Sequence, residues 1–173
     1  MLLKCHTIQN NYHMKKILIT LIVSMTVMLT SCFKELDKVL DDATYVEFQE
    51  AIVRTVAVGK TYPLIAAANG SGVVTTPKVN FVGRQRATDT QIKYVIDQAE
   101  TTAKEGTHYK INDGGTIIIK ANDSFGTANF EILRVPVATE DRGKIFTVVL
   151  VLSDGTDFKA SENYKRIGYR ITL

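Results

Sequence analysis

The segment Ile145–Leu152 reads IFTVVLVL and is nearly all apolar and β-branched. β-Branched residues favour strands, because their side chains pack well on a pleated surface. A short, continuous apolar run is typical of a strand that is covered on both of its faces. We therefore expect this segment to be a central buried strand, with Val148, Leu150 and Leu152 in the hydrophobic core.

The segments at the two ends of the region around this strand alternate apolar and polar residues. Tyr45–Gln49 alternates around Val46 and Phe48, and Tyr164–Leu173 alternates along its whole length. A period of two residues indicates a strand with one buried and one exposed face. In the last segment the alternation predicts Ile167, Tyr169 and Ile171 on the buried face and Arg166, Arg170 and Thr172 on the exposed face.

Further short strands are predicted between turn-forming residues. Pro63 places its strand at a sheet edge, because proline cannot donate to the ladder. Asn112–Gly115 predicts a hairpin turn, and Asn69–Gly72 another turn. Glu100–Gly106 predicts at most one turn of helix. The segments predicted as extended are Ala51–Val58, Lys60–Ala67, Val79–Val82, Ile92–Asp97, Tyr109–Ile111, Thr116–Ile119 and Phe130–Val137. Seven or more short strands predict an all-β fold, a single antiparallel β-sandwich over residues 44–173.

The amino-terminal region has the features of a signal peptide. Met14–Lys16 is a short basic start, and the apolar run Ile17–Leu29 follows. This run is shorter than the roughly 20 residues that a membrane-spanning helix needs. A basic start, a short apolar run and small residues before a cleavage site are typical of secretion signals. We interpret residues 1–31 as the signal peptide, Met14 as its true start and residues 1–13 as an upstream extension.

Leu29-Thr30-Ser31-Cys32 resembles the lipobox of bacterial lipoproteins. The resemblance implies cleavage between Ser31 and Cys32 and a lipid on the Cys32 sulfur, which makes the membrane a partner of the chain. Two or more acyl chains give a stable anchor where one alone is marginal. Cys5 lies before the cut, so the mature chain keeps no other cysteine.

Residues 33–43 are predicted to form a charged tether between the lipidated cysteine and the sandwich. Lys34-Glu35 resembles the export signal that sends Bacteroidota lipoproteins to the outer face of the outer membrane, although Leu36 interrupts the acidic residues. A solvated tether is the other interpretation. We expect a protein of the outer membrane that faces the cell exterior.

The charge balance excludes one class of partner. Of the 21 basic residues, Lys4, Lys15 and Lys16 precede Cys32, whereas all 18 acidic residues follow it. The mature chain is therefore about neutral. A nucleic-acid-binding protein has a basic footprint, so nucleic acid is not an expected partner.

Several motifs in order resemble Calx-β modules and uncharacterised lipoprotein domains of Bacteroidota. Thr102–Tyr109 reads TAKEGTHY and is similar to the thr-ala-x-glu-gly-x-x-tyr segment of these modules. Phe146–Ser153 resembles the late core strand of the family. The other matching stretches are Ile119–Asn122, Val135–Val137 and Ser161–Tyr164. The resemblance covers Tyr45–Leu173 and implies an immunoglobulin-like sandwich on a lipid tether.

Catalytic chemistry has little support in the sequence. His108 is the single histidine of the mature chain, so no histidine pair exists for zinc. We interpret His108 as a structural strand residue, and a ligand or pH switch is the alternative. Ser71 lacks the first glycine of a nucleophile elbow. We expect no enzyme, no cofactor and no metal. Four loop carboxylates, Glu140, Asp141, Asp154 and Asp157, are candidate calcium ligands by analogy with some Calx-β modules, but we interpret them as turn residues.

A non-catalytic binding module, either an accessory of polysaccharide uptake or an adhesion or assembly module with a protein partner, is the expected function. Loops at the end of a rigid sandwich suit binding, so Asn69–Lys78 and Gly83–Thr90 are the candidate regions. A sugar site needs an aromatic platform, and the chain has no tryptophan. Of its tyrosines, Tyr62 beside Pro63 is predicted to be the most exposed. The mature tyrosines are Tyr45, Tyr62, Tyr94, Tyr109, Tyr164 and Tyr169, and the pattern assigns none of them to a ligand.

Overall fold

The computed structural model of the chain describes residues 43–68 and 73–173. The predicted signal peptide, Ser31, Cys32 and Ser71 lie outside these residues, as do nearly all of the tether and the turn Asn69–Gly72. Within them the chain is all-β, as predicted. The elements are β1 (Tyr45–Phe48), α2 (Gln49–Val53), β2 (Leu64–Ala68), β3 (Val73–Thr75), β4 (Lys78–Val82), β5 (Thr90–Ile96), β6 (Tyr109–Ile111), β7 (Thr116–Ile119), β8 (Phe125–Thr127), β9 (Phe130–Ile132), the 3₁₀ turn η2 (Thr139–Asp141), β10 (Ile145–Leu152), β11 (Lys159–Ala160) and β12 (Arg166–Thr172).

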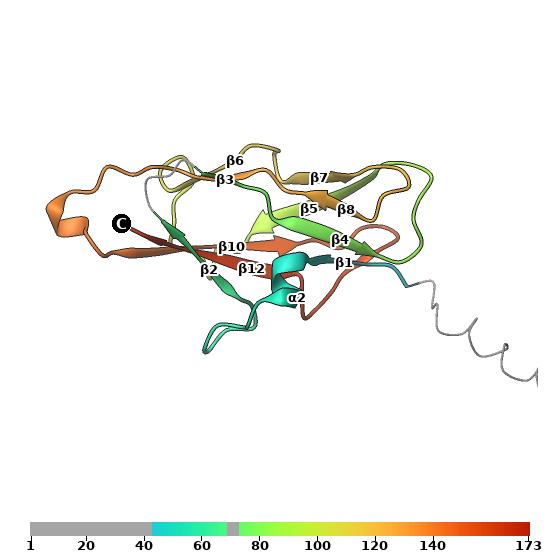
Figure 1. Ribbon diagram of the computed structural model, residues 1–173, viewed down its shortest axis with the longest axis horizontal. Helices are drawn as coiled ribbons and strands as arrows, with labels where there is room; N and C mark the ends of the chain where they lie inside the picture. The colour runs from blue at the N-terminus through green and yellow to red at the C-terminus, as the bar shows by residue number, and fades with distance from the viewer. Residues whose placement is uncertain (1–42, 69–72) are drawn as a thin grey trace, which may run out of the picture. The chain divides into compact units, whose positions relative to one another are not determined.

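The strands form a sandwich of two layers (Figure 1). One layer is a five-stranded sheet with the order β2-β12-β10-β5-β7. The other contains a four-stranded sheet, β11-β1-β4-β8, and a three-stranded sheet, β3-β9-β6. The pairs are antiparallel except for β1 with β11 and β2 with β12, which are parallel and place β11 and β2 at sheet edges.

The strand β10 is central, as its sequence predicts. It pairs with β12 along seven residue positions and with β5 through Tyr94, Val95 and Ile96. Val148, Leu150 and Leu152 are buried in the core, which confirms their predicted positions. Ile167, Tyr169 and Ile171 of β12 are buried beside them, also as predicted.

Two threonines complete the edge of β10 where β5 has already ended. The Val149 N–H donates to the Thr101 hydroxyl at 3.0 Å, and the Thr147 N–H donates to the Thr102 hydroxyl at 2.9 Å. Buried backbone donors need such partners, and short side-chain hydroxyls can substitute for backbone carbonyls. The polar segment after β5 therefore acts as an irregular continuation of the sheet.

The prediction of a strand over Ala51–Val58 is wrong. Gln49–Val53 forms the short helix α2, and a loop runs from it to β2. The reason is topological, since β1 belongs to one layer and β2 to the other, so the chain must change layers here. Of the segment Ala51–Val58 only Ala51 is buried, because it packs on the core.

The predicted hairpin at Asn112–Gly115 is also wrong. The residues do turn, but β6 pairs with β9 and β7 pairs with β5, so the turn is an arch between two sheets. Gly114 and Gly115 both have positive φ, a conformation that favours glycine. The Asp113 carboxylate accepts from the Tyr94 hydroxyl, the Gly115 N–H and the Asn129 N–H, at 2.7, 2.9 and 2.6 Å. These three bonds fix the arch.

Two smaller expectations have mixed outcomes. The strand β9 ends at Ile132, so Val135–Val137 is not part of a strand, contrary to the prediction. Pro63 does precede an edge strand, and its carbonyl accepts from Gly168 N–H at 3.0 Å. In the described part of the chain, no helix has the length and apolar character of a membrane span.

Candidate functional site: a polar cleft at one end of the sandwich

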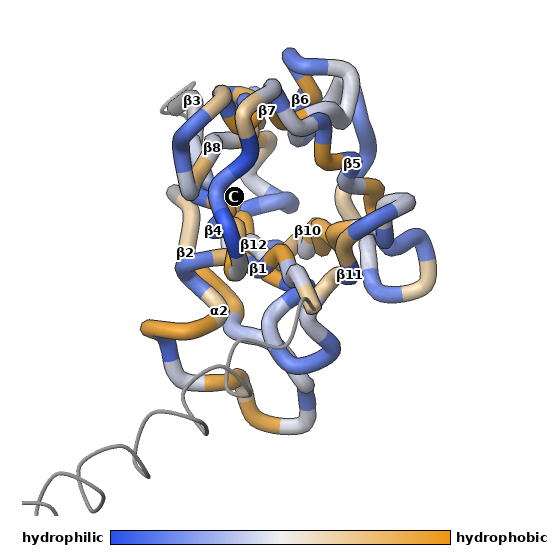
Figure 2. Tube along the Cα trace, turned by 90° about the vertical axis from the view of Figure 1, so that its right-hand side faces the viewer, coloured by the Kyte–Doolittle hydropathy of each residue, from blue (hydrophilic) through white to orange (hydrophobic). Residues whose placement is uncertain are grey.

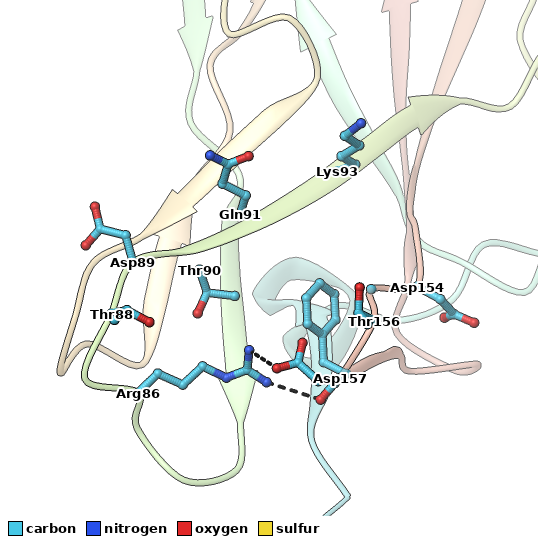
Figure 3. Close-up of a pocket in the computed structure, with 11 residues that line it drawn as sticks. Arg86, Thr88, Asp89, Thr90, Gln91, Lys93, Asp154, Thr156 and Asp157 are labelled. Atoms are coloured by element: carbon cyan, nitrogen blue, oxygen red, sulfur yellow. Dashed lines mark hydrogen bonds and ion pairs between the residues drawn. The ribbon is translucent and has the colours of Figure 1, made fainter.

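A cleft of about 530 Å³ lies where two loops meet the start of β5, and we call it the end cleft (Figure 3). One loop follows β4 and the other follows β10. The first belongs to Gly83–Thr90, one of the two regions predicted to bind. The lining residues are Arg86, Thr88, Asp89, Thr90, Gln91, Lys93, Asp154, Gly155, Thr156, Asp157 and Phe158.

Arg86 holds the two loops together. Its guanidinium forms an ion pair with the Asp157 carboxylate at 2.6 Å and donates to the Asp157 carbonyl at 3.1 Å. The same group lies 4.8 Å from the centre of the Phe81 ring and 6.0 Å from that of Phe158. A planar guanidinium suits this combination of a bidentate contact and stacking on aromatic rings. The Arg86 guanidinium is therefore engaged by groups of the protein itself and fixes the shape of the cleft.

The loop after β10 is closed by its own bonds. The Asp154 carboxylate accepts from the Ala160 N–H at 2.9 Å, and the Gly155 N–H donates to the Phe158 carbonyl at 3.0 Å. A Cβ at Gly155 would lie 2.3 Å from the Phe158 ring, so any larger residue would displace this ring. The wall that faces β5 is thus fixed in shape.

Asp89 at the rim is held ionised. Its carboxylate pairs with the Lys120 ammonium at 2.9 Å and accepts from the Ala121 N–H at 2.9 Å. Both contacts lower the pKa of Asp89 below its ordinary value, the lysine contact most. Lys120, which closes the apolar run of β7, therefore orders the rim as well.

Five polar side chains of the cleft have no hydrogen-bond partner among the described residues, and one of them, Thr90, is buried at the start of β5. Gln91 and Lys93 project from β5 (Figure 3), and Thr88 and Thr156 stand on the two loops. An amide both donates and accepts, a hydroxyl does the same, and an ammonium donates. The cleft therefore offers a fixed polar surface with free groups of both kinds, suited to a ligand rich in hydroxyls.

Tyr45 lies on the other side of the Gly155–Phe158 loop. It lines a smaller hollow of about 310 Å³ together with Thr44, Thr156 and Lys159. Its side chain is exposed at 42%. An exposed ring beside free polar groups is what stacking against a sugar requires.

The four candidate calcium carboxylates do not form one site. Glu140 and Asp141 lie in η2, before β10, whereas Asp154 and Asp157 follow it. A strand of this length separates its ends by about 26 Å, and Figure 1 shows the two loops at opposite ends of the sandwich. Three of the four have a local partner: Asp141 pairs with Lys144, Asp157 pairs with Arg86, and Asp154 accepts from the Ala160 N–H. No group of three or more potential metal-binding side chains exists among the described residues.

His108 has the surroundings of a structural residue. It is buried, its Nδ1 accepts from the Lys104 N–H at 2.9 Å, and its ring lies 4.1 Å from that of Phe146. The backbone turns back here, because the His108 N–H donates to the Lys104 carbonyl at 2.8 Å. The side chain therefore closes the turn of the TAKEGTHY segment.

The prediction that Tyr62 is the most exposed tyrosine is wrong. Its side chain is 2% exposed, because it packs against Gly168 on the outer face of the five-stranded sheet. Among the tyrosines that the structure describes, Tyr45 and Tyr164 are exposed. Tyr164 lies in a different hollow, with Ala51, Val56 and Lys165.

Sequence reasoning missed Gln91, Lys93 and Thr156 as cleft residues. The period-two alternation of β5 does place Gln91 and Lys93 on its exposed face. No local sequence pattern predicts that the loop after β10 lies next to Gln91 and Lys93. That contact depends on the long-range pairing of Tyr94 with Leu152.

Comparisons with known proteins identify the fold. Neither the protein-family models nor the curated proteins include a match to this chain. Among solved structures, the apo form of the Calx CBD1 domain is similar, with a TM-score of 0.53, 13% identity and coverage of 75% of this chain and 96% of that chain. CBD12 from CALX1.2 gives a TM-score of 0.51 at 12% identity and covers 73% of this chain and 43% of that chain. The chain therefore has the Calx-β-like sandwich that its motifs predict.

A third solved structure is more distant. It is a two-domain protein of unknown function from Bacteroides fragilis NCTC 9343, with a TM-score of 0.46 and 11% identity. It covers 83% of this chain and 50% of that chain. Likeness at these identities concerns the fold and not the ligand, because one fold hosts many functions.

Proposed function

We propose that the protein is a lipid-anchored, non-catalytic binding module of the bacterial cell envelope and that its end cleft binds a saccharide. The observation that carries the proposal is the set of accessible, unpartnered polar side chains, Thr88, Gln91, Lys93 and Thr156, in a cleft that Arg86 holds in shape. The proposed role is that of an accessory of polysaccharide uptake at the cell surface.

The chemistry of the cleft suits a sugar better than a charged ligand. Arg86 and Asp157 neutralise each other, Asp89 is paired with Lys120, and the remaining charges of the cleft, Lys93 and Asp154, are of opposite sign. Free hydroxyls and an amide match the alternating donors and acceptors of a sugar ring. Tyr45, across the loop, supplies an exposed aromatic face.

A catalytic role has less support, because the acids of the cleft are engaged. General acid–base catalysis of glycoside cleavage needs two free carboxyl groups that face one bond. Here Asp89, Asp154 and Asp157 each accept from a group of the protein itself. We therefore propose binding without turnover.

The proposed location in the cell envelope rests on the amino-terminal sequence. The lipobox at Leu29–Cys32 and the Lys34-Glu35 pair that follows support lipidation of Cys32 and a place in the outer membrane, facing outward. The tether of residues 33–43 then joins the sandwich to the anchor.

A binding screen of the Thr44–Leu173 domain against polysaccharides and their oligosaccharides tests the proposal. We expect a saccharide whose affinity falls at least tenfold in the double variant Gln91→Ala, Lys93→Ala. The matched control is Gln98→Ala, an exposed glutamine beyond the other end of β5, which should bind like the parent. Equal losses in both variants, or sugar turnover that one carboxylate substitution abolishes, would overturn the proposal.

A protein partner is the second candidate, and the edge strand β2 favours it. Leu64–Ala68 reads LIAAA, carries no charge, and pairs on one side with β12. Because Gly168 N–H donates to the Pro63 carbonyl, the ladder's alternation turns the Ala66 N–H outward. An uncharged edge with outward N–H groups can accept a strand from a partner. Capture of an outer-membrane protein that is lost in Ala66→Pro and kept in Ala66→Ser would favour this function.

A further inference from the structure

The segment Ile52–Val58, which we call the apolar loop, exposes several large apolar side chains. Val53 is exposed at 66%, Ile52 and Val56 at 40% and 48%, and Val58 completely. Figure 1 shows the chain after α2 standing away from the two layers, and Figure 2 shows hydrophobic segments along it. A cluster of exposed apolar side chains on a protrusion is typical of an interaction site.

The apolar loop is held in one shape by its backbone. The Ala57 N–H donates to the Tyr62 carbonyl at 3.1 Å, and the Lys60 N–H donates to the Ala57 carbonyl at 3.0 Å. Gly59 turns the chain with a φ of 74°, which glycine adopts without strain. The loop therefore presents its valines on a closed turn.

The base of the loop is fixed to the outer face of the five-stranded sheet. The buried Tyr62 ring packs on Gly168, where a Cβ would come within 3.0 Å of it. The Tyr62 hydroxyl donates to the Glu100 carboxylate at 3.1 Å, and Lys60 pairs with the same carboxylate. The sandwich thus holds the apolar side chains out as a rigid protrusion.

The charges on this segment are all positive. Arg54 and Lys60 stand within residues 51–61, which contain no acidic residue. Lys60 is already paired with Glu100, so Arg54 is the cation of this segment that has no ion-pair partner among the described residues. Apolar side chains beside a cation suit the boundary between acyl chains and anionic headgroups, where the apolar groups insert and the cation meets a phosphate. A protein groove lined by acids would match the Arg54 cation too, but it would leave unused the anchor proposed at Cys32.

The chain between Cys32 and Ala43 is long enough for this contact. Its residues can span at most about 40 Å when fully extended, whereas a strand as long as β10 measures about 26 Å. The tether therefore lets any face of the sandwich reach the surface that holds the lipid. It also keeps the loop at a high local concentration near that surface.

We propose that the apolar loop inserts into the lipid–water interface of the membrane to which Cys32 is anchored, as a second attachment that orients the sandwich. The inference rests on the proposed lipid anchor. It adds a lipid-binding site to the proposed saccharide module. It also implies that the outer face of the five-stranded sheet lies against the membrane, while the other surfaces of the sandwich stay free for ligand.

The test uses the lipidated protein in vesicles of phosphatidylethanolamine and phosphatidylglycerol, with one environment-sensitive fluorophore. The mature chain has no thiol besides the lipidated Cys32, so Val58→Cys can be labelled alone. The control is Val82→Cys, an exposed valine at the end of β4 on the opposite layer. We expect the Val58 probe to shift to the blue and to lose emission to nitroxide-labelled lipids, and the Val82 probe to do neither.

Each other result overturns the inference. Water-like emission from both probes would show that the loop does not enter the lipid. A blue shift at position 58 without quenching by the labelled lipids would show that protein, a partner or a second copy, covers the loop. If Cys32 carries no lipid, the anchor fails. Cys32→Ser protein, held to nickel-chelating vesicles by an amino-terminal hexahistidine tag, then decides the question for the loop by the same two readings, and water-like emission at position 58 overturns the inference there too.

Discussion

His108 shows how one side chain can couple stability to pH without serving a ligand. Burial lowers the pKa of His108 below its ordinary value. As pH falls, the unfolded chain takes up the proton first, so stability is complete above the unfolded pKa of about 6.5 and is lost as pH falls through the lower, folded pKa.

We therefore expect the free energy of unfolding to decrease between pH 7 and pH 5. Urea denaturation at a series of pH values measures it. His108→Gln, which cannot take up the proton, should flatten the dependence in this range. A slope that is equally steep in the variant would assign the effect to other groups.

The burial of Leu150 gives a second prediction for a single residue. Truncation of a fully buried leucine to alanine costs about 2–5 kcal/mol, because it removes apolar contacts and leaves a cavity. Leu150 is fully buried in the central strand, whereas Lys159 is exposed on β11. Leu150→Ala should lower the free energy of unfolding by this amount and Lys159→Ala by little. Equal effects would mean that the core lies elsewhere.

Among the elements, the arch at Asp113 makes the most specific demand on its residue. Both carboxylate oxygens accept from protein donors, two of them backbone N–H groups. In Asp113→Asn one oxygen becomes an NH₂ group that faces a donor, so at least one bond is lost, at about 1–3 kcal/mol. Thermal unfolding measures the loss. The control is Asp141→Asn, which removes an exposed pair with Lys144 and should matter little. An unchanged melting temperature in Asp113→Asn would show that the arch does not depend on these bonds.

The elements also show which information is local in the sequence. Val148, Leu150 and Leu152 and the alternating faces of β12 were predictable, because burial imposes its period on each strand separately. The helix α2 was not, since Ala51–Val58 is rich in β-branched residues and only the change of layer excludes a strand there. The hairpin at Asn112–Gly115 failed for a related reason, because a turn sequence fixes a reversal but not which strands then pair.

The residues of the candidate site also fall into those that the sequence could predict and those that it could not. Gly83–Thr90 was predictable as a loop region suited to binding, because polar, glycine-containing segments mark loops. Gln91, Lys93 and Thr156 were not, because their meeting depends on β5 and β10 being neighbours. Tyr62 was misplaced, since the partner that buries it, Gly168, is far along the chain.

At the scale of the whole molecule, the amino-terminal sequence predicts a lipid anchor. We expect Cys32 to be the first residue of the mature protein and to carry lipid, because the apolar run and the lipobox agree. Mass spectrometry of the membrane-extracted protein measures both. A chain that keeps Met14 without lipid, or a Cys32→Ala protein that stays firmly in the membrane fraction, would contradict the prediction.

The proposed function is a property of the whole sandwich, since it joins two loops and a strand from distant parts of the chain. The most direct measurement is a titration of the ¹⁵N-labelled Thr44–Leu173 domain with the saccharide that binds best in the screen, followed by NMR. Binding in the end cleft predicts that the largest amide shifts cluster at Thr88, Gln91, Lys93 and Thr156, with the Gln98 amide unchanged. Shifts that cluster along β2 or the apolar loop, or no shifts with any saccharide, would contradict it.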